Sequence, residues 1–574
     1  MISHPAFILF ATAALVRLTR GRARAGLLLA GAVAALVAAA SLSPGAHWGY
    51  TVGDYQLQLL HVDSLSHLFG LIFTLIMVVG ALYALHATRA GEHGAALVYA
   101  GGALGVVYAG DWVSAFVWWE LMAMASLVVV WSGDTDRAGT AGFRYLFVHV
   151  AGGSLFFAGL ALHLSGGGAL ELGPFGDVRG WGYALILLGV AINAAVPPFH
   201  AWLVDAYPEA SITGMVFLSA FTTKTAVYLL IRVFPGSDLL LWAGITMALY
   251  GVVYAVLEND IRRLLGYHIV SQVGYMVAAV GLGTPLALAG AAAHAFCHIL
   301  YKALLLMGAG AVMTATGRRK LTDLGGIWRQ MPVVVVLYFV GALSISGAPL
   351  FNGFISKSMI ITAAGDDGHG VAELLLTLAS IGTFLHTGLK LPYFTFFGPA
   401  RGLRLSPVPI NMIAAMGVAA ACCIGLGLVP SWLYARLATS TPVDYHPYTL
   451  DHVGGALQLL GGTALGFWWL LSKLKGEATD SLDTDWFYRR PLPVVVDWVI
   501  AAASVTGQVA QATAQRIVQT ATGLAANPLT GLGRLVTGGT GAMPPYDEDR
   551  YRFPIGVTVF WVVLALGVLT LLVG

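Results

Sequence analysis

The segment His294-Ala-Phe-Cys-His298-Ile-Leu-Tyr-Lys302-Ala-Leu-Leu places three titratable side chains four residues apart among apolar ones. At this spacing His294, His298 and Lys302 share one face of a helix and span about 12 Å along it. Ionisable residues inside a membrane helix face the bundle interior or a water-filled cavity. The segment therefore predicts a membrane helix that passes protons along one face through intervening water.

A structural role is the alternative for this segment, with the two histidines hydrogen-bonding across neighbouring helices. That role suits a single histidine better than three groups in register. A zinc site is disfavoured, because lysine is not a usual zinc ligand and no third ligand is evident in the sequence.

The composition is that of an integral membrane protein. The chain has 574 residues, of which 58% are hydrophobic and 10% charged, whereas soluble proteins carry about 25% charge. The 71 glycines favour close packing of membrane helices. The three cysteines form no CxxC motif, so we expect neither metal nor cofactor, and any redox chemistry must occur in another protein.

Apolar segments predict an all-α polytopic membrane protein with about 16 transmembrane helices. Two segments contain helix breakers, Pro197-Pro198 in one and Gly347-Ala-Pro349 in the other, and are predicted to be broken helices. The predicted spans are residues 5–16, 25–42, 66–88, 94–110, 112–132, 142–164, 181–198, 211–232, 238–257, 262–281, 286–314, 330–362, 371–398, 407–431, 452–473 and 554–573.

The loop cations predict the orientation of the chain in the cytoplasmic membrane. With both termini outside, 23 of the 30 lysines and arginines fall in inside loops and three in outside loops. Such an asymmetry follows the positive-inside rule. We therefore expect both termini outside and the segment between the last two spans inside.

The four remaining cations lie within spans, and all four are lysines: Lys224, Lys302, Lys357 and Lys390. Arginine keeps its proton in a protein, whereas a buried lysine can release one. These lysines are thus candidate proton carriers. For Lys390, which lies near the inner end of its span, reaching out to the interface is an equally good explanation.

One acid lies at similar depth. Glu120 is near the middle of its span, where a carboxylate must be protonated or paired. His149 and His386 are further in-span histidines, more often structural than proton-carrying, and we regard them as auxiliary candidates.

Several motifs occur in a fixed order between about residues 60 and 400, and they resemble those of one family. They are Phe116-Val-Trp-Trp-Glu120-Leu, Pro198-Phe-His-Ala-Trp-Leu-Val-Asp205-Ala, Thr223-Lys224-Thr-Ala-Val-Tyr228, Arg262-Arg-Leu-Leu-Gly-Tyr267, Ser271-Gln-Val-Gly-Tyr275, the 294–305 segment and Gly353-Phe-Ile-Ser-Lys357. The chain resembles the antiporter-like subunits shared by Mrp-type multisubunit cation/proton antiporters, respiratory complex I and membrane-bound hydrogenases.

The resemblance implies two inverted five-helix repeats, each with one broken helix, a common transporter arrangement. It divides the chain into N-terminal helices (1–93), two repeats (94–236 and 237–400), additional helices (401–475), an inside loop with an amphipathic helix (476–553) and a final span (554–574).

The resemblance also implies roles for the buried charges. Glu120 matches the acid of an ion pair, and Lys224 the lysine on the last helix of the first repeat. Lys302 matches the central lysine, with His294 and His298 as companions on its helix. Lys357 matches the residue from which a proton leaves towards the outside.

One position departs from the family pattern. The lysine expected on the first broken helix falls at Asn193, which cannot carry a proton charge. We expect Glu120 to use another partner, with Lys224 as the first candidate and His149 as the second, while Asn193 provides a hydrogen bond and room for water. The alternative is a first repeat that carries no protons.

Residues 493–526 predict an amphipathic helix, with alanine, isoleucine and leucine on one stripe and glutamines largely opposite. This segment resembles the lateral helix that some family members lay along a neighbouring subunit. A helix lying on lipid is the alternative.

The sequence thus predicts a proton-translocating subunit of a multisubunit sodium (or other monovalent cation)/proton antiporter, as its D-type subunit, with other membrane subunits as partners. One alternative is the proton-pumping subunit of a redox complex of the hydrogenase or NADH dehydrogenase type, which would have no redox chemistry of its own. Another is a structural scaffold whose proton path is disabled at Asn193.

Overall fold

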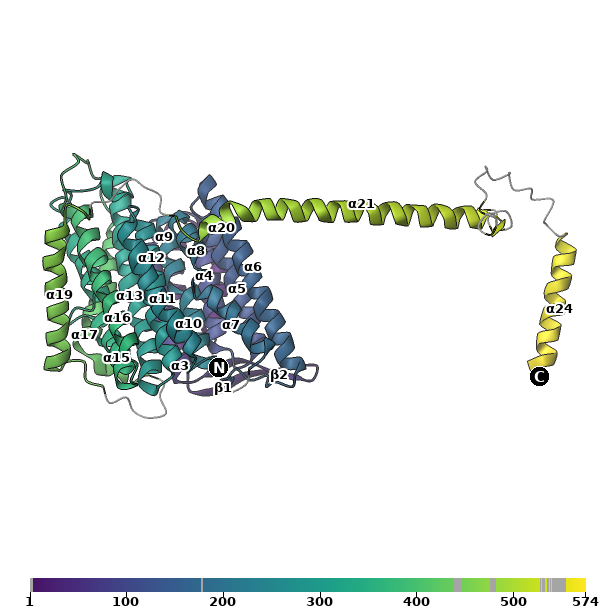
Figure 1. Cartoon of the computed structure of the whole chain (residues 1–574), viewed down its shortest axis with the longest axis horizontal. Coiled ribbons are helices and arrows are strands. Elements are labelled where there is room, and N and C mark those ends of the chain that lie inside the picture. Colours follow the sequence, from purple (N-terminus) through teal and green to yellow (C-terminus); the bar gives the residue numbers. More distant parts are fainter. Residues whose placement is uncertain are drawn as a thin grey trace. The chain divides into compact units, whose positions relative to one another are not determined.

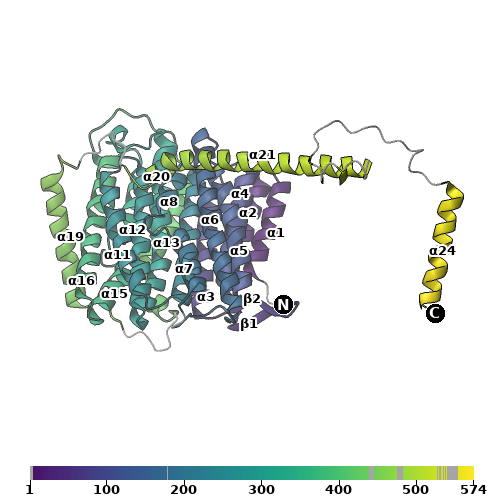
Figure 2. The same ribbon diagram turned by 45° about the vertical axis from the view of Figure 1, so that its right-hand side comes forward.

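A computed structural model describes residues 4–176, 179–437, 445–474, 482–526 and 554–573, with a few isolated positions between 528 and 538. It divides into two units, one ending at Asp485 and the other beginning at Trp486. The first unit is a bundle of upright helices, with α19 at one edge and the N-terminal helices towards the other (Figures 1 and 2).

The helices confirm a polytopic membrane protein. Among the described residues, twelve helices are long and apolar enough to cross a membrane, and four more apolar helices are shorter. The predicted count of sixteen spans is not confirmed. Broken helices such as α7 and α14 fall below a span's length, and α4 falls outside both sets.

The N-terminal region contains a feature that the all-α prediction missed. Helices α1 (Pro5–Leu18), α2 (Gly21–Ala40) and α3 (Ser64–Tyr83) frame an antiparallel hairpin of β1 (Gly45–Val52) and β2 (Tyr55–Val62). Its two-residue turn contains Gly53, whose φ of +58° suits glycine. Because the hairpin lies between two strongly apolar segments, its own short pattern is easily overlooked.

Two five-helix repeats form the centre of the bundle. The first consists of α4 (Ala90–Tyr108), α5 (Trp112–Trp131), α6 (Asp136–Ser165), the broken α7–α8 (Trp181–Asn193, Ala201–Ala206) and the interrupted α9–α10 (Ile212–Ala220, Thr222–Val233). The second consists of α11 (Asp238–Leu257), α12 (Ile261–Leu282), α13 (Pro285–Thr316), the broken α14–α15 (Pro332–Ile345, Asn352–Asp366) and α16 (Gly370–Thr383) with the π-helix η3 (Phe384–Lys390).

The two repeats have matching local features at positions 149 residues apart in the sequence, and we call this correspondence the 149-residue register. Asp111 caps α5 and Asp260 caps α12, and the same two residues pair with Glu171 and Lys320 in isolated β-bridges. Thr135 caps α6 as Thr284 caps α13. Each pair is 149 positions apart, so the two repeats begin their core helices with the same capping chemistry.

Both predicted helix breaks are present, and they are built alike. The Val196 N–H bonds the Ala191 carbonyl and the Ala348 N–H bonds the Leu343 carbonyl, each at 3.0 Å. The residue before each donor, Ala195 or Gly347, has a positive φ of 60° or 72°. This pattern terminates a helix in the Schellman manner, and a proline follows in both cases.

The helices that follow the repeats are α17 (Ile410–Leu428), α18 (Pro430–Tyr434) and α19 (Leu450–Leu470). Beyond them, the segment around Asp483 returns to the bundle. The buried Asp483 carboxylate accepts hydrogen bonds from Tyr250 and Tyr267 and lies 3.3 Å from Nε2 of His200. Tyr254 also donates to the Leu482 carbonyl at 2.9 Å.

The second unit contains α21 (Pro491–Ala526) after the short α20 (Asp485–Arg489), and α24 (Ile555–Val573). The predicted amphipathic helix is therefore formed, with 36 residues and a length of about 54 Å. Parts of the predicted 476–553 region, including residues 476–481 and 539–553, lie outside the described residues.

Candidate functional site

The His294–Lys302 row lies on α13 in the centre of the bundle, and all three side chains are fully buried. Nδ1 of His294 is 2.9 Å from the Ser356 hydroxyl, and Tyr301 lies 3.3 Å from its Nε2. Both ring nitrogens of His298 and the Lys302 amine have no hydrogen-bond partner within the described residues. These unpartnered polar groups need water or a passing proton carrier.

Lys224 lies just after the interruption between α9 and α10. Its amine donates to the Ser219 carbonyl at 2.7 Å and to the Thr223 hydroxyl at 3.0 Å. It interacts electrostatically with His298 and Lys302 of the second repeat. Lys224 therefore connects the two repeats at the centre of the bundle.

Lys357 lies beyond the second helix break. Its amine donates to the Ile345 carbonyl at the end of α14 at 2.8 Å and lies 5.1 Å from the centre of the Tyr275 ring. The carboxyl end of a helix carries partial negative charge, which suits an ammonium group. Lys357 also lines a cavity of about 480 Å³ between α15, α16 and α19, whose lining includes Asp366, Glu373 and Asp451.

Glu120 faces α6 and not Lys224. A Cβ atom added at Gly153 would lie 2.1 Å from Glu120 Oε1, so the carboxylate occupies the space left by this glycine. Glu120 forms no ion pair in the described part of the chain, and Lys224 bonds Ser219 instead. The two groups suggested for a relay are therefore not in direct contact.

Asn193 lies beside His149, its neighbour from α6. Both side chains are buried, and neither forms an aligned hydrogen bond with a described residue. The His149 ring lies 4.0 Å, centroid to centroid, from Tyr145, whose hydroxyl bonds Ser126 at 2.7 Å. In the 149-residue register His149 corresponds to His298, so each repeat carries a histidine at this place.

His386 and Lys390 lie on the π-helix η3, and both are buried. The Lys390 amine donates to the carbonyls of Val256 and Glu258 at the end of α11. Sequence reasoning missed the partner of His386, which is His268 on α12: Nε2 of His268 lies 2.7 Å from Nδ1 of His386. No spacing rule joins these positions, and the only available signal was another histidine in an apolar segment.

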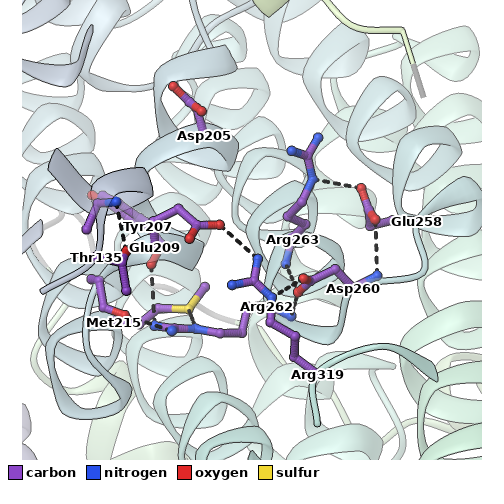
Figure 3. Close-up of polar contacts among 12 residues, drawn as sticks. Thr135, Asp205, Tyr207, Glu209, Met215, Glu258, Asp260, Arg262, Arg263 and Arg319 are labelled. Atoms are coloured by element: carbon purple, nitrogen blue, oxygen red, sulfur yellow. Dashed lines mark hydrogen bonds and ion pairs between the residues drawn. The ribbon is translucent and has the colours of Figure 1, made fainter. Parts of the chain in front are cut away.

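A charged cluster closes the end of the bundle where the repeats meet (Figure 3). Arg319 bridges Asp260 and Glu209, and Arg263 bonds Glu258 at 3.0 Å. The guanidinium of Arg262 is buried. It donates to the Ala210 and Ser211 carbonyls just before α9 and to the Met215 sulfur within α9. A cavity of about 500 Å³, lined in part by Arg262 and Arg319, adjoins the cluster.

The described residues contain no group of three or more histidine, cysteine, aspartate or glutamate side chains arranged to hold a metal ion. The lysine, histidine and glutamate side chains described above can bind and release protons, and hydroxyl groups and helix-end carbonyls lie beside several of them.

The sequence matches the family model described as "NADH:quinone oxidoreductase/Mrp antiporter, TM" over residues 109–385. It is 30% identical over 362 residues to an uncharacterized protein of Methanocaldococcus jannaschii, a match covering 58% of this chain and 74% of that protein. It is 32% identical over 319 residues to the D-type subunit of the Na(+)/H(+) antiporter of Alkalihalophilus pseudofirmus, covering 52% of this chain and 64% of that protein.

Two solved structures share the fold. A chain of the Mrp complex from Dietzia sp. is 25% identical with a TM-score of 0.64, covering 81% of this chain and 94% of that chain. A chain of the membrane-bound sulfane sulfur reductase, an archaeal respiratory membrane complex, is 21% identical with a TM-score of 0.70 and 99% coverage of both chains. The chain therefore belongs to the antiporter-like membrane protein family that NADH:quinone oxidoreductases and Mrp antiporters share.

Proposed function

We propose that this chain is the proton-translocating subunit of a larger complex in the cytoplasmic membrane. The observation that carries this proposal is the buried row of proton-binding groups through the centre of the bundle. Lys224 interacts electrostatically with His298 and Lys302, and His294 with Lys357. Such a row of ionisable residues within a membrane protein supports movement of protons through intervening water.

The direction of the path follows from the positions of the lysines. Lys224 and Lys302 are fully buried at the junction of the repeats, whereas Lys357 lines a cavity of about 480 Å³. Each lysine can hold and release a proton, which an arginine at the same place could not do. The cavity supports Lys357 as the exchange point with the outside, and full burial at the junction supports Lys302 as the centre of the path.

The complex to which the subunit belongs is a monovalent cation/proton antiporter of the Mrp type, with this chain as its D-type subunit. The support is the 32% identity to the D-type subunit of an Na(+)/H(+) antiporter, over 64% of that protein. The sodium ion and the partner subunits belong to this same proposal.

A redox-driven proton pump is the second candidate. It is favoured by the fold match along 99% of both chains to a chain of the sulfane sulfur reductase complex, which extends through α21 and α24. Purification of the complex from its native membrane separates the candidates, since redox subunits with iron–sulfur clusters accompany a pump and not an antiporter.

Lys302→Ala tests the proton path. In the complex purified with its partners and reconstituted into vesicles, we expect this variant to assemble normally and to lose proton movement, followed with a pH-sensitive dye inside the vesicles. Lys320→Ala, which removes an exposed loop lysine, is the matched control and keeps the parent rate. Near-parent proton movement by assembled Lys302→Ala would leave the structural-scaffold role as the better account.

A further inference from the structure

The last helix of the second repeat departs from α-helical geometry at a buried place. The α-helix α16 ends at Thr383, and Phe384–Lys390 continue as a π-helix. Short π-helical segments are rare and occur frequently at functional sites. Here the segment brings His386, Thr387 and Lys390 into the protein interior, each at most 2% exposed.

His386 meets His268 of α12 in a closely packed pair. The two imidazole centroids are 4.1 Å apart, and Nε2 of His268 lies 2.7 Å from Nδ1 of His386. The Thr387 hydroxyl also contacts Nε2 of His268. A neutral imidazole has one N–H and one acceptor nitrogen, so this contact is a hydrogen bond through which the rings can share a proton.

On one side of the pair, contacts continue through Lys390 to the charged cluster around Glu258 and Arg263. His386 interacts electrostatically with Lys390, whose amine bonds carbonyl groups at the end of α11, including that of Glu258. The Glu258 carboxylate belongs to the charged cluster, where it bonds Arg263 (Figure 3). Nε2 of His386 faces the Val252 carbonyl but forms no aligned hydrogen bond with a described residue.

On the other side, the pair interacts with Lys302 at the centre of the bundle. His268 interacts electrostatically with Lys302, and so does His386. Nδ1 of His268 and the Lys302 amine have no hydrogen-bond partner in the described parts of the chain. Each ring of the pair thus keeps one nitrogen without a hydrogen-bond partner among the described residues, and the pair interacts electrostatically with both Lys390 and Lys302.

We propose that the His268–His386 pair is the proton intake of the second repeat, carrying protons from Lys390 to Lys302. This role rests on the proposed function of proton translocation. A proton from the Lys390 ammonium binds Nε2 of His386, which releases its Nδ1 proton to Nε2 of His268. His268 then releases its Nδ1 proton through water to the Lys302 amine, so one N–H bond breaks and one forms at each step.

His268→Gln and His386→Gln test the intake. Glutamine keeps a hydrogen-bond donor and an acceptor but carries no proton at physiological pH, so a purely structural contact is largely preserved. We expect assembled complexes with unchanged thermal stability whose proton movement falls by about 100-fold or more, the range typical for losing a proton-transfer group. We expect the double variant to be no slower than the slower single variant, because both residues serve one path.

His163→Gln is the matched control, since His163 is an in-span histidine of α6 whose hydrogen bond among the described residues is to the nearby Ala169 carbonyl. It should keep the parent rate. If Lys302→Ala abolishes proton movement while the assembled double variant keeps the parent rate, the pair is not the intake, although the central path stands. If Lys302→Ala also keeps the parent rate, the proposed function itself has failed.

Discussion

At the scale of single residues, the two repeats use different chemistry at corresponding places. In the 149-residue register, Tyr145, His149 and Gly153 correspond to His294, His298 and Lys302. The histidine is retained, but the first repeat has a glycine where the second has its central lysine. The Glu120 carboxylate lies against that glycine, so an acid approaches the region that the amine occupies in the second repeat.

Gly153→Ala should displace the Glu120 carboxylate, because the new Cβ would lie 2.1 Å from its Oε1. The group that must move is the end of a flexible side chain, so we expect thermal stability to change little. If Glu120 carries protons, the displacement should slow proton movement by about 10–100-fold, as misplaced catalytic groups do. Vesicle proton uptake by the assembled complex measures the effect.

Gly139→Ala, on the same helix, is the control for Gly153→Ala, because a Cβ at position 139 meets nothing within 4 Å. Parent rates from both variants would mean that Glu120 does not carry protons in the first repeat.

Some site residues could be anticipated from the sequence and others could not. The regular spacing of His294, His298 and Lys302 indicated their common helix face, because helical periodicity is a local property. The pairing of His268 with His386 joins residues 118 positions apart through a π-helical segment, which no local pattern encodes. The expected contact between Glu120 and Lys224 is absent because the break after α9 provides the Ser219 carbonyl as a nearer partner for the lysine.

At the scale of elements, helix interruptions place the functional groups. Lys224 follows the break after α9, Lys357 follows the break after α14, and Lys390 lies on a π-helix. Prolines indicated the two sharp breaks, since proline cannot continue a helix. The π-helix contains no proline and one glycine, Gly388, so little in its sequence distinguishes it from an ordinary α-helix.

The Asp483 attachment gives a prediction at this scale. Burial tends to raise the pKa of the Asp483 carboxyl, but its contact with His200 and the hydrogen bonds from the hydroxyls of Tyr250 and Tyr267 lower that pKa below its ordinary value. Asp483→Asn should therefore reduce the free energy of unfolding at pH 7 by about 1–3 kcal/mol, the range for hydrogen bonds to charged groups. Thermal unfolding of the purified protein measures the loss.

The pH dependence of that loss has a definite sign. A carboxyl whose pKa is lowered in the folded state adds stability above its unfolded pKa of about 3.9, and this stability is lost as the pH falls further. The difference in melting temperature between the parent and Asp483→Asn should persist from about pH 5 to 8 and should narrow below about pH 4. A difference that vanishes already at about pH 6 would contradict this account.

At the scale of the whole molecule, some loops predicted to lie inside contact one another. Arg24 bonds the Thr88 carbonyl, and Arg89 pairs with Asp134. Arg232, predicted outside, pairs with Asp63 beside the hairpin. The membrane class and the helix breaks could be predicted because hydropathy and breaker residues are strong signals, and the repeats followed from the family resemblance. The hairpin and the number of spans depend on tertiary packing.

Cysteine labelling tests the predicted orientation. Tyr50→Cys lies on the exposed hairpin, and Asp134→Cys lies in the loop between α5 and α6. With the termini outside, a membrane-impermeant thiol reagent added to intact cells should label position 50 but not position 134 until the cells are opened. The parent chain sets the background from its own cysteines, two of which are buried. The reverse pattern would invert the topology.

The attachment of Asp483 also has a mechanical consequence. It is held by His200, next to the broken helix of the first repeat, and by Tyr250 and Tyr267 of the second. Since the chain continues from Asp483 directly into α20 and α21, a pull along that continuation acts on this carboxylate. Because the carboxylate is bound by residues of both repeats, such a force acts on both repeats together and strains the interface between them, and does not pull away a single helix.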